Sequence, residues 1–253
     1  MAQSKLVKIL SLVSIIAGCS QGPTVTESAK RSTASSGNLT PGQQYQKPIQ
    51  QPVGQLTPEL ALQKDVASAY NQLSGYSGIL ETIDKKGSKT IICKAAVKFR
   101  KPEQVRIDIQ SNSDEPKQAG TKAVWSGGKT LKVRPSGILG FAKVDLPTTD
   151  SRVLTQNGWR IDQISLRANV MLFLDQRTKV KILGDGKLGN LPLVFTEVVG
   201  PFNVQGIDRM KMGFDRQSKL PLTVDFLQGS SSVYSIRLLN MQLRSPSPSE
   251  FEL

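Results

Sequence analysis

The chain has 253 residues, a formal net charge of +13, two cysteines and no histidine. The lack of histidine excludes the histidine forms of hydrolytic triads and removes the commonest metal ligand, so we expect neither a metal nor a cofactor. The basic residues are dispersed rather than clustered with aromatics, which disfavours nucleic acid as a partner. The positive charge could meet an anionic lipid or polymer, or it could serve only solubility.

The N-terminal segment has the pattern of a bacterial lipoprotein signal. Two lysines precede an apolar stretch, and small residues lead into Cys19. The apolar stretch is too short to span a bilayer, which is typical of a cleaved secretory signal. We therefore predict that residues 1–18 are a signal peptide and that Cys19 carries a lipid. Such a lipid would anchor the protein in the cell envelope, facing the periplasm. Ser20 is compatible with sorting to the outer membrane.

The next segment has a different composition. Residues 20–56 consist mainly of Ser, Thr, Gln, Gly and Pro, and large apolar residues are nearly absent. Such a segment cannot bury enough surface to offset the entropy cost of ordering. We predict that residues 19–56 form a lipidated N-terminus with a disordered tether, and that residues 57–253 form one folded domain.

The folded domain is predicted to begin with a helix. Thr57 is a good N-cap and is followed by proline and an acidic residue. The helix is expected to run to about Leu73, with Leu60, Val66 and Tyr70 near one face. Between residues 160 and 174 the apolar period again fits a helix better than a strand.

Most of the remaining chain alternates between apolar and polar residues, which indicates strands with one buried face. The alternating runs are separated by glycine-containing turns, so we predict an antiparallel sheet. The clearest runs lie at 91–99, 105–109, 131–133, 180–182, 210–214, 222–226 and 236–238.

Three motifs suggest chemistry but do not fit its structural context. Residues 184–189 match G-x-G-x-x-G, yet the following residues 191–198 have a strand pattern rather than the helix that nucleotide binding requires. Residues 126–129 match S-x-x-K, but the two glycines favour a hairpin. Cys93 lies on the apolar side of its strand and is interpreted as a buried structural thiol. Without a visible acid–base pair, we expect a protein that is not an enzyme.

Three stretches together resemble the LolA-like outer-membrane lipoprotein-sorting superfamily. They are VKFRKPEQVR at 97–106, WSGGKTL at 125–131 and FDRQSKLPL at 214–222. Gly127 stands where that family has aspartate. The resemblance implies an α+β fold with a single curved antiparallel sheet, a half-open β-barrel, whose concave apolar face is covered by helices. It also implies an apolar cavity that holds acyl chains.

We therefore expect the chain to bind acyl chains of a lipid or lipoprotein, as a carrier, chaperone or sensor. The same apolar residues would equally fill a closed core. The candidate cavity residues are Val97, Phe99, Val105, Ile107, Leu131, Val133, Met210, Met212, Phe214 and Phe226.

An alternative function is a structural or assembly lipoprotein that docks on another envelope component. The docking surface would then be the basic face of the sheet, because polar residues alternate with the apolar ones. Its candidate residues are Lys94, Lys98, Arg106 and Lys132.

Overall fold

The computed structural model describes residues 56–137, 140–202 and 204–253. The predicted signal peptide 1–18, the lipidation site Cys19 and the tether 19–56 lie outside the described residues, apart from Leu56. These three assignments therefore stay predictions. Within the described residues, no helix combines the length and the apolar character needed to cross a bilayer.

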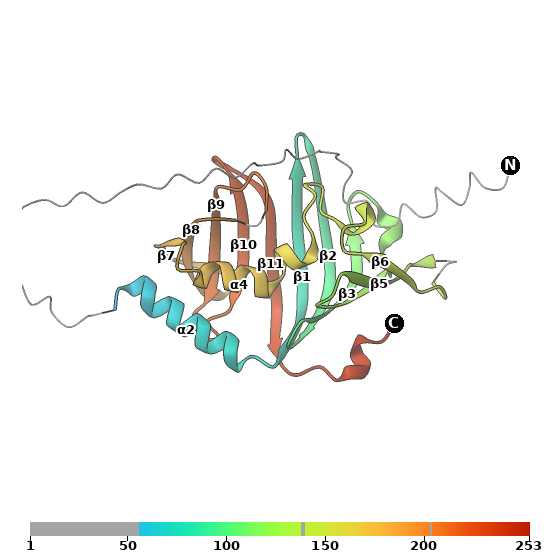
Figure 1. Cartoon of the computed structure of the whole chain (residues 1–253), viewed down its shortest axis with the longest axis horizontal. Helices are drawn as coiled ribbons and strands as arrows, with labels where there is room; N and C mark the ends of the chain where they lie inside the picture. The colour runs from blue at the N-terminus through green and yellow to red at the C-terminus, as the bar shows by residue number, and fades with distance from the viewer. Residues whose placement is uncertain (1–55, 138–139, 203) are drawn as a thin grey trace, which may run out of the picture. The chain divides into compact units, whose positions relative to one another are not determined.

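The domain is built on one antiparallel sheet of eleven strands (Figure 1). Its spatial order is β6-β5-β4-β3-β2-β1-β11-β10-β9-β8-β7. Two meanders therefore meet where β1 pairs with β11, and β6 and β7 remain as separate edges of a curved, unclosed sheet. The expected fold class is confirmed. The first meander comprises β1 (Gly75–Lys86), β2 (Lys89–Arg100), β3 (Gln104–Asn112), β4 (Lys122–Ser126), β5 (Thr130–Arg134) and β6 (Val144–Pro147), and the second comprises β7 (Lys179–Leu188), β8 (Leu191–Val199), β9 (Arg209–Asp215), β10 (Pro221–Gln228) and β11 (Ser231–Leu243).

Strand alternation separates an inner, helix-covered face from an outer face. In β2, Val97 and Phe99 are buried on the inner face, whereas Lys94 is exposed on the outer one. The G-x-G-x-x-G sequence ends β7 and turns into β8, with Gly189 at φ +59°. This left-handed conformation suits glycine and reverses the chain into a strand. The sequence indicated a glycine-rich turn over residues 184–189. This was wrong for residues 184–188, which continue β7, and only Gly189 of the motif lies in the turn.

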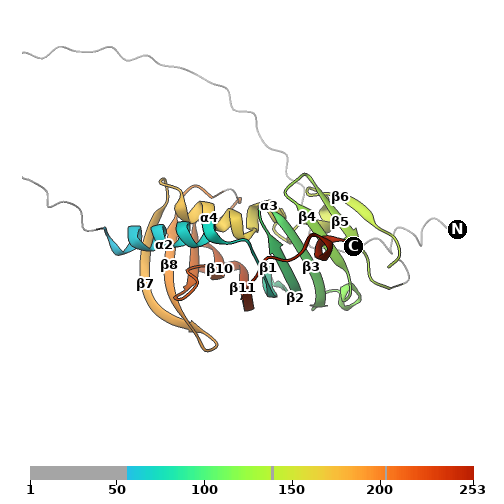
Figure 2. The same ribbon diagram turned by 90° about the horizontal axis from the view of Figure 1, so that it is seen from below.

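The α-helices of the described residues lie on the inner face of the sheet (Figure 2). Helix α2 (Pro58–Gln72) begins where predicted, and the Thr57 hydroxyl accepts a hydrogen bond from the Leu60 NH at 3.3 Å. The second predicted helical region forms α3 (Ile161–Ile164) and α4 (Leu166–Leu174). Leu60 was predicted to lie on the apolar face of this helix. This prediction was wrong, because the Leu60 side chain is 49% exposed. Short 3₁₀ turns occupy Pro116–Gln118, Ser151–Val153 and Pro248–Phe251.

Packing is dense where α4 crosses the second meander. Phe173 of α4 is completely buried, and the centroid of its ring lies 4.5 Å from that of Phe214 on β9. Val66 of α2 and Val170 of α4 are also fully buried in the same cluster. In addition, the Gln63 side-chain amide donates to the Phe173 carbonyl at 2.7 Å. These contacts fix both helices on this half of the sheet.

The substitution Phe173→Ala should strongly destabilise the domain, because it removes a completely buried ring that the surrounding side chains cannot replace. We expect a loss of about 3–5 kcal/mol in the free energy of unfolding, measured by chemical denaturation. Phe141→Ala is the matched control, since Phe141 is 80% exposed. The control should change stability by less than about 0.5 kcal/mol. Equal effects of the two substitutions would contradict the assignment of Phe173 to the core.

Candidate functional site

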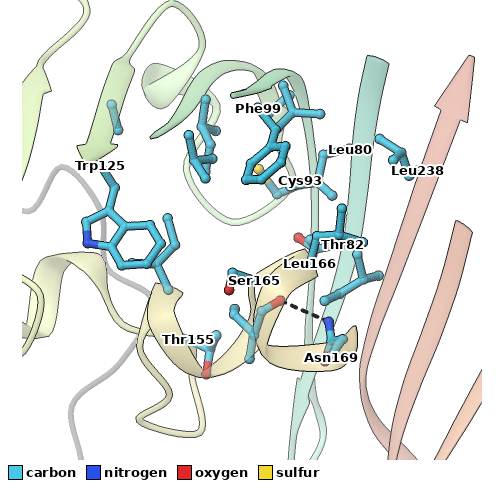
Figure 3. Close-up of a pocket in the computed structure, with 18 of the residues that line it drawn as sticks. Leu80, Thr82, Cys93, Phe99, Trp125, Thr155, Ser165, Leu166, Asn169 and Leu238 are labelled. Atoms are coloured by element: carbon cyan, nitrogen blue, oxygen red, sulfur yellow. Dashed lines mark hydrogen bonds between the residues drawn. The ribbon is translucent and has the colours of Figure 1, made fainter. Parts of the chain in front are cut away.

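A cavity of about 220 Å³ lies between the first meander and residues 153–169, which include α3 and the start of α4. The sheet contributes inner-face side chains from β1 to β5, β10 and β11. Residues 153–169 form the opposite wall. In Figure 3, Phe99 and Cys93 of β2 face Ser165 and Leu166 across this space. Few protein voids exceed the size of a water molecule, so a cavity this large needs an explanation.

The cavity wall is almost wholly apolar. Six of the ten residues that were predicted to line a cavity do so, and they come from three strands of the first meander: Val97, Phe99, Val105, Ile107, Leu131 and Val133. Along β3, β4 and β5 the residues Ile107, Ala123 and Val133 are paired in register and form one row of the wall. A dry apolar cavity of this kind binds apolar ligands in preference to water.

The other four predicted residues do not line this cavity. Met210, Met212, Phe214 and Phe226 lie in β9 and β10 with at most 1% of their surface exposed. They belong to the main buried cluster, in which Phe214 packs on Phe173 of α4 and Phe226 packs on Trp159. The physical reason is that alternation identifies the inner face of a strand. It does not indicate whether a helix packs closely on that part of the face.

Several cavity residues were not predicted from the sequence. Both tryptophans of the chain, Trp125 on β4 and Trp159 before α3, line the wall. Cys93 also lies in the wall, and burial raises the pKa of its thiol to about 11. The thiol is therefore protonated at neutral pH and is a poor nucleophile, in agreement with its structural interpretation.

The segment opposite the sheet is attached to β1 through Asp84. The Asp84 carboxylate accepts from the Gln156 NH at 2.6 Å and from the Asn157 side-chain amide at 3.0 Å. The Gln156 side chain donates back to the Asp84 carbonyl at 2.8 Å, and Lys86 donates to the Gln156 carbonyl at 3.0 Å. These polar contacts position the start of the cavity-covering segment over the sheet.

Burial raises the pKa of Asp84 to about 6 from an ordinary value of 3.8. The hydrogen bonds from Gln156 and Asn157 favour the ionised form and offset only part of this shift. Because the folded state binds this proton more tightly than the unfolded state, the associated stability is present at low pH. It is lost as pH rises through about 6.

Among the described residues, only two charged side chains lie in the cavity wall, Glu103 between β2 and β3 and Arg167 in the first turn of α4. They form an ion pair in which Arg167 Nη1 contacts Glu103 Oε1. A Cβ atom at Gly127 would lie 2.6 Å from a Glu103 carboxylate oxygen, so glycine is needed where the resembled family has aspartate. The charged pair marks the polar end of the cavity.

The predicted basic face is the outer face of the same sheet, and three of its four candidate residues form ion pairs within the chain, two of them with carboxylates that also pair with an arginine. Lys94 pairs with Glu81 at 3.1 Å, and Lys98 pairs with Glu250 at 2.8 Å. Arg106 pairs with Asp108 at 2.8 Å and also donates to the carbonyls of Glu250 and Glu252 at 2.9 Å. Of the four candidates, only Lys132 has no ion pair among the described residues. The C-terminal segment thus covers part of this face.

Acidic and sulfur ligands are dispersed in the described part of the chain, where no group of three or more could hold a metal ion. Of the ionisable groups in the cavity wall, the Glu103 carboxylate and the Arg167 guanidinium form an ion pair.

No family model and no curated protein sequence matches this chain. Solved structures do show similarity. An uncharacterised conserved protein from Thermus thermophilus is 10% identical, with 74% of this chain and 91% of that chain covered and a TM-score of 0.46. The Mycobacterium tuberculosis lipoprotein LppX is 14% identical, with coverage of 73% and 93% and a TM-score of 0.46. A LolA superfamily protein from Nitrosomonas europaea is 11% identical, with coverage of 76% and 96% and a TM-score of 0.36. At these identities the likeness is one of fold.

The variant Asp84→Asn should change how stability depends on pH, because asparagine retains a carbonyl acceptor for the Gln156 NH without an ionisable proton. Relative to the wild-type value, the variant's free energy of unfolding should increase as pH rises from about 4 to about 7, because only the wild type loses stability over this range. Denaturant titrations at several pH values test this. Asp145→Asn, at an exposed position of edge strand β6, controls for the loss of a carboxylate. Parallel pH profiles for wild type and Asp84→Asn would contradict the assignment.

Proposed function

We propose that this protein is a lipid-anchored, non-enzymatic component of the bacterial cell envelope that binds an acyl chain in the cavity of its first meander. The single observation that carries the proposal is the unfilled apolar cavity of about 220 Å³, beside a second meander that is densely packed. The location is supported by the lipoprotein signal that precedes Cys19.

The energetics favour an apolar ligand. Transfer of a hydrocarbon chain from water into this space gains roughly 25 cal/mol for each Å² of apolar surface removed from water. Any space that the fold itself provides reduces the part of this gain that is spent on ordering the protein. Its volume is below the roughly 300–1,000 Å³ that is common for small-molecule sites, which favours one slender chain over a multi-chain lipid.

The alternative function, docking through the basic face, has less support. Such docking relies on unpaired positive charge, whereas Lys94, Lys98 and Arg106 each have an acidic partner within the chain. Displacing those partners would cost part of any gain from a new contact. We therefore assign ligand binding to the cavity and not to the outer face.

Both tryptophans line the cavity, so binding should change the intrinsic fluorescence of the chain. We expect dodecanol, a neutral single-chain probe, to produce a saturable change in emission of the full-length chain carrying Cys19→Ser, which cannot be lipidated. The variant Ala123→Phe should weaken this binding at least roughly tenfold, because the added ring occupies the middle of the cavity.

Lys132→Phe is the matched control, since it adds the same ring on the opposite face of the neighbouring strand. It should leave the dodecanol titration unchanged. Because Ala123→Phe fills existing space, it should also retain most of the wild-type stability. Absence of any emission change in the wild-type chain would contradict the proposal, as would equal binding by the two phenylalanine variants.

Cys93 provides a second readout from the cavity wall. With Cys19 replaced, it is the sole remaining cysteine of the chain, and its raised pKa near 11 should make alkylation by a maleimide slow at pH 7. Saturating dodecanol should slow the alkylation further, by roughly tenfold, because a bound chain blocks access to the sulfur. The rate is measured by mass spectrometry. An alkylation rate unaffected by dodecanol would place the ligand outside this cavity.

A further inference from the structure

We propose that the mouth of the cavity selects amphiphiles with a zwitterionic head, in which a phosphate and an ammonium group are joined, over heads with one net charge. This inference rests on the proposed binding of an acyl chain and specifies the chemical class of the ligand. It is argued from the position, the pairing and the balance of the charges around Glu103 and Arg167.

The charged pair lies where the cavity adjoins an open groove. A groove of about 430 Å³ on the surface shares Glu103, Trp125, Ser165 and Arg167 with the cavity wall. The Arg167 side chain is 52% exposed and that of Glu103 is 19% exposed, so the guanidinium is the more accessible of the two. An amphiphile whose chain fills the apolar cavity would therefore place its polar head beside this pair.

The other charges of the groove are already compensated. Asp162 pairs with Arg160 at 2.8 Å, and Asp175 pairs with Arg177 at 2.6 Å. The groove itself contains three carboxylates and two guanidinium groups, so it carries no excess of positive charge among the described residues, despite the basic composition of the chain. A net anionic head therefore meets only cations that are already paired, and Arg167 is available only if it leaves Glu103.

Separating Glu103 from Arg167 without replacement is unfavourable, because each charge would lose its partner. A purely anionic head could pair with Arg167, but it would leave the largely buried Glu103 carboxylate beside a second negative charge. A purely cationic head would leave Arg167 uncompensated. A zwitterionic head satisfies both groups, since its phosphate oxygens accept from the guanidinium and its ammonium donates to the carboxylate.

The position of Glu103 is fixed by the adjacent hairpin. Gly127 has φ +78° in the turn between β4 and β5, and its lack of a side chain leaves the space that the Glu103 carboxylate occupies. On the opposite side, the Ser165 hydroxyl accepts from the Ala168 NH at 3.2 Å and caps the helix that carries Arg167. Both charged groups are thus held by rigid elements, which favours a defined head-group geometry.

The test compares three lauroyl lipids with the same chain: lysophosphatidylethanolamine, lysophosphatidylglycerol and monolauroylglycerol. Each is titrated below its micelle concentration into the full-length Cys19→Ser chain, and tryptophan emission is measured. For the wild-type cavity mouth, we expect the zwitterionic lysophosphatidylethanolamine to bind roughly tenfold more tightly than the anionic lysophosphatidylglycerol. Monolauroylglycerol is the uncharged reference. The preference should weaken as salt is added.

Two charge-removing variants should change this preference in opposite directions. Glu103→Gln frees Arg167, so lysophosphatidylglycerol should gain affinity and equal or exceed the zwitterionic lipid. Arg167→Gln should reduce the zwitterionic lipid to the affinity of monolauroylglycerol. Arg237→Gln is the matched control, because its guanidinium is 46% exposed, pairs with Glu81 at 3.4 Å and lines neither the cavity nor the groove; it should keep the wild-type preference. A gain of affinity in Glu103→Gln cannot arise from misfolding.

The outcomes separate this inference from the proposed function. Equal affinities of the wild-type chain for all three lipids would overturn head-group selection and leave chain binding intact. Tighter binding of lysophosphatidylglycerol by the wild type would also overturn it, in favour of an anionic ligand. If none of the three lipids binds, including the uncharged one, the proposed function itself fails.

Discussion

The structure depends on one constraint: the inner face of an unclosed eleven-stranded sheet is apolar and must be covered. The helices cover it unequally. Over the second meander, α4 brings Phe173 onto Phe214 and leaves a filled core. Over the first meander, the covering segment reaches the sheet through Asp84 and its partners. Apolar side chains on that half pack on one another within the sheet, as Tyr76 does on Phe99, but leave space beneath the covering segment. The cavity follows from this uneven cover.

The two halves also differ in the forces that hold them. The α2–α4 side is held by apolar burial, which is spread over many side chains and is insensitive to pH. The cover of the cavity begins at a small set of hydrogen bonds around a buried carboxylate, and such contacts open locally at lower cost than a packed core. The contacts around Asp84 should therefore open before the core beneath Phe173 does.

The sequence allowed prediction of the fold class, the first helix and most strands, because Thr57 and the alternation in β2 are local signals. It was least informative for β1, the central strand, where Gly78, Thr82 and Asp84 occupy inner-face positions that are usually apolar. Thr82 lines the cavity, and Asp84 accepts a hydrogen bond from the segment that covers it. The cavity was predicted only for its first-meander wall, since alternation does not indicate how closely a helix packs. The pairing of Glu103 with Arg167 has no local signal, because tertiary structure alone brings them together.

The pairing of β1 with β11 has a consequence for the order of folding. Tyr76 lies opposite Leu243, so the first and last strands of the domain are neighbours at the centre of the sheet. Each meander can form from sequential hairpins, whereas this central seam requires closure of nearly the whole chain, a slow and entropically costly step. Ile236 and Leu238 of β11 complete the cavity wall. The cavity wall is therefore complete only after the last strand has been synthesised and inserted, and a chain that ends before β11 lacks this part of the wall.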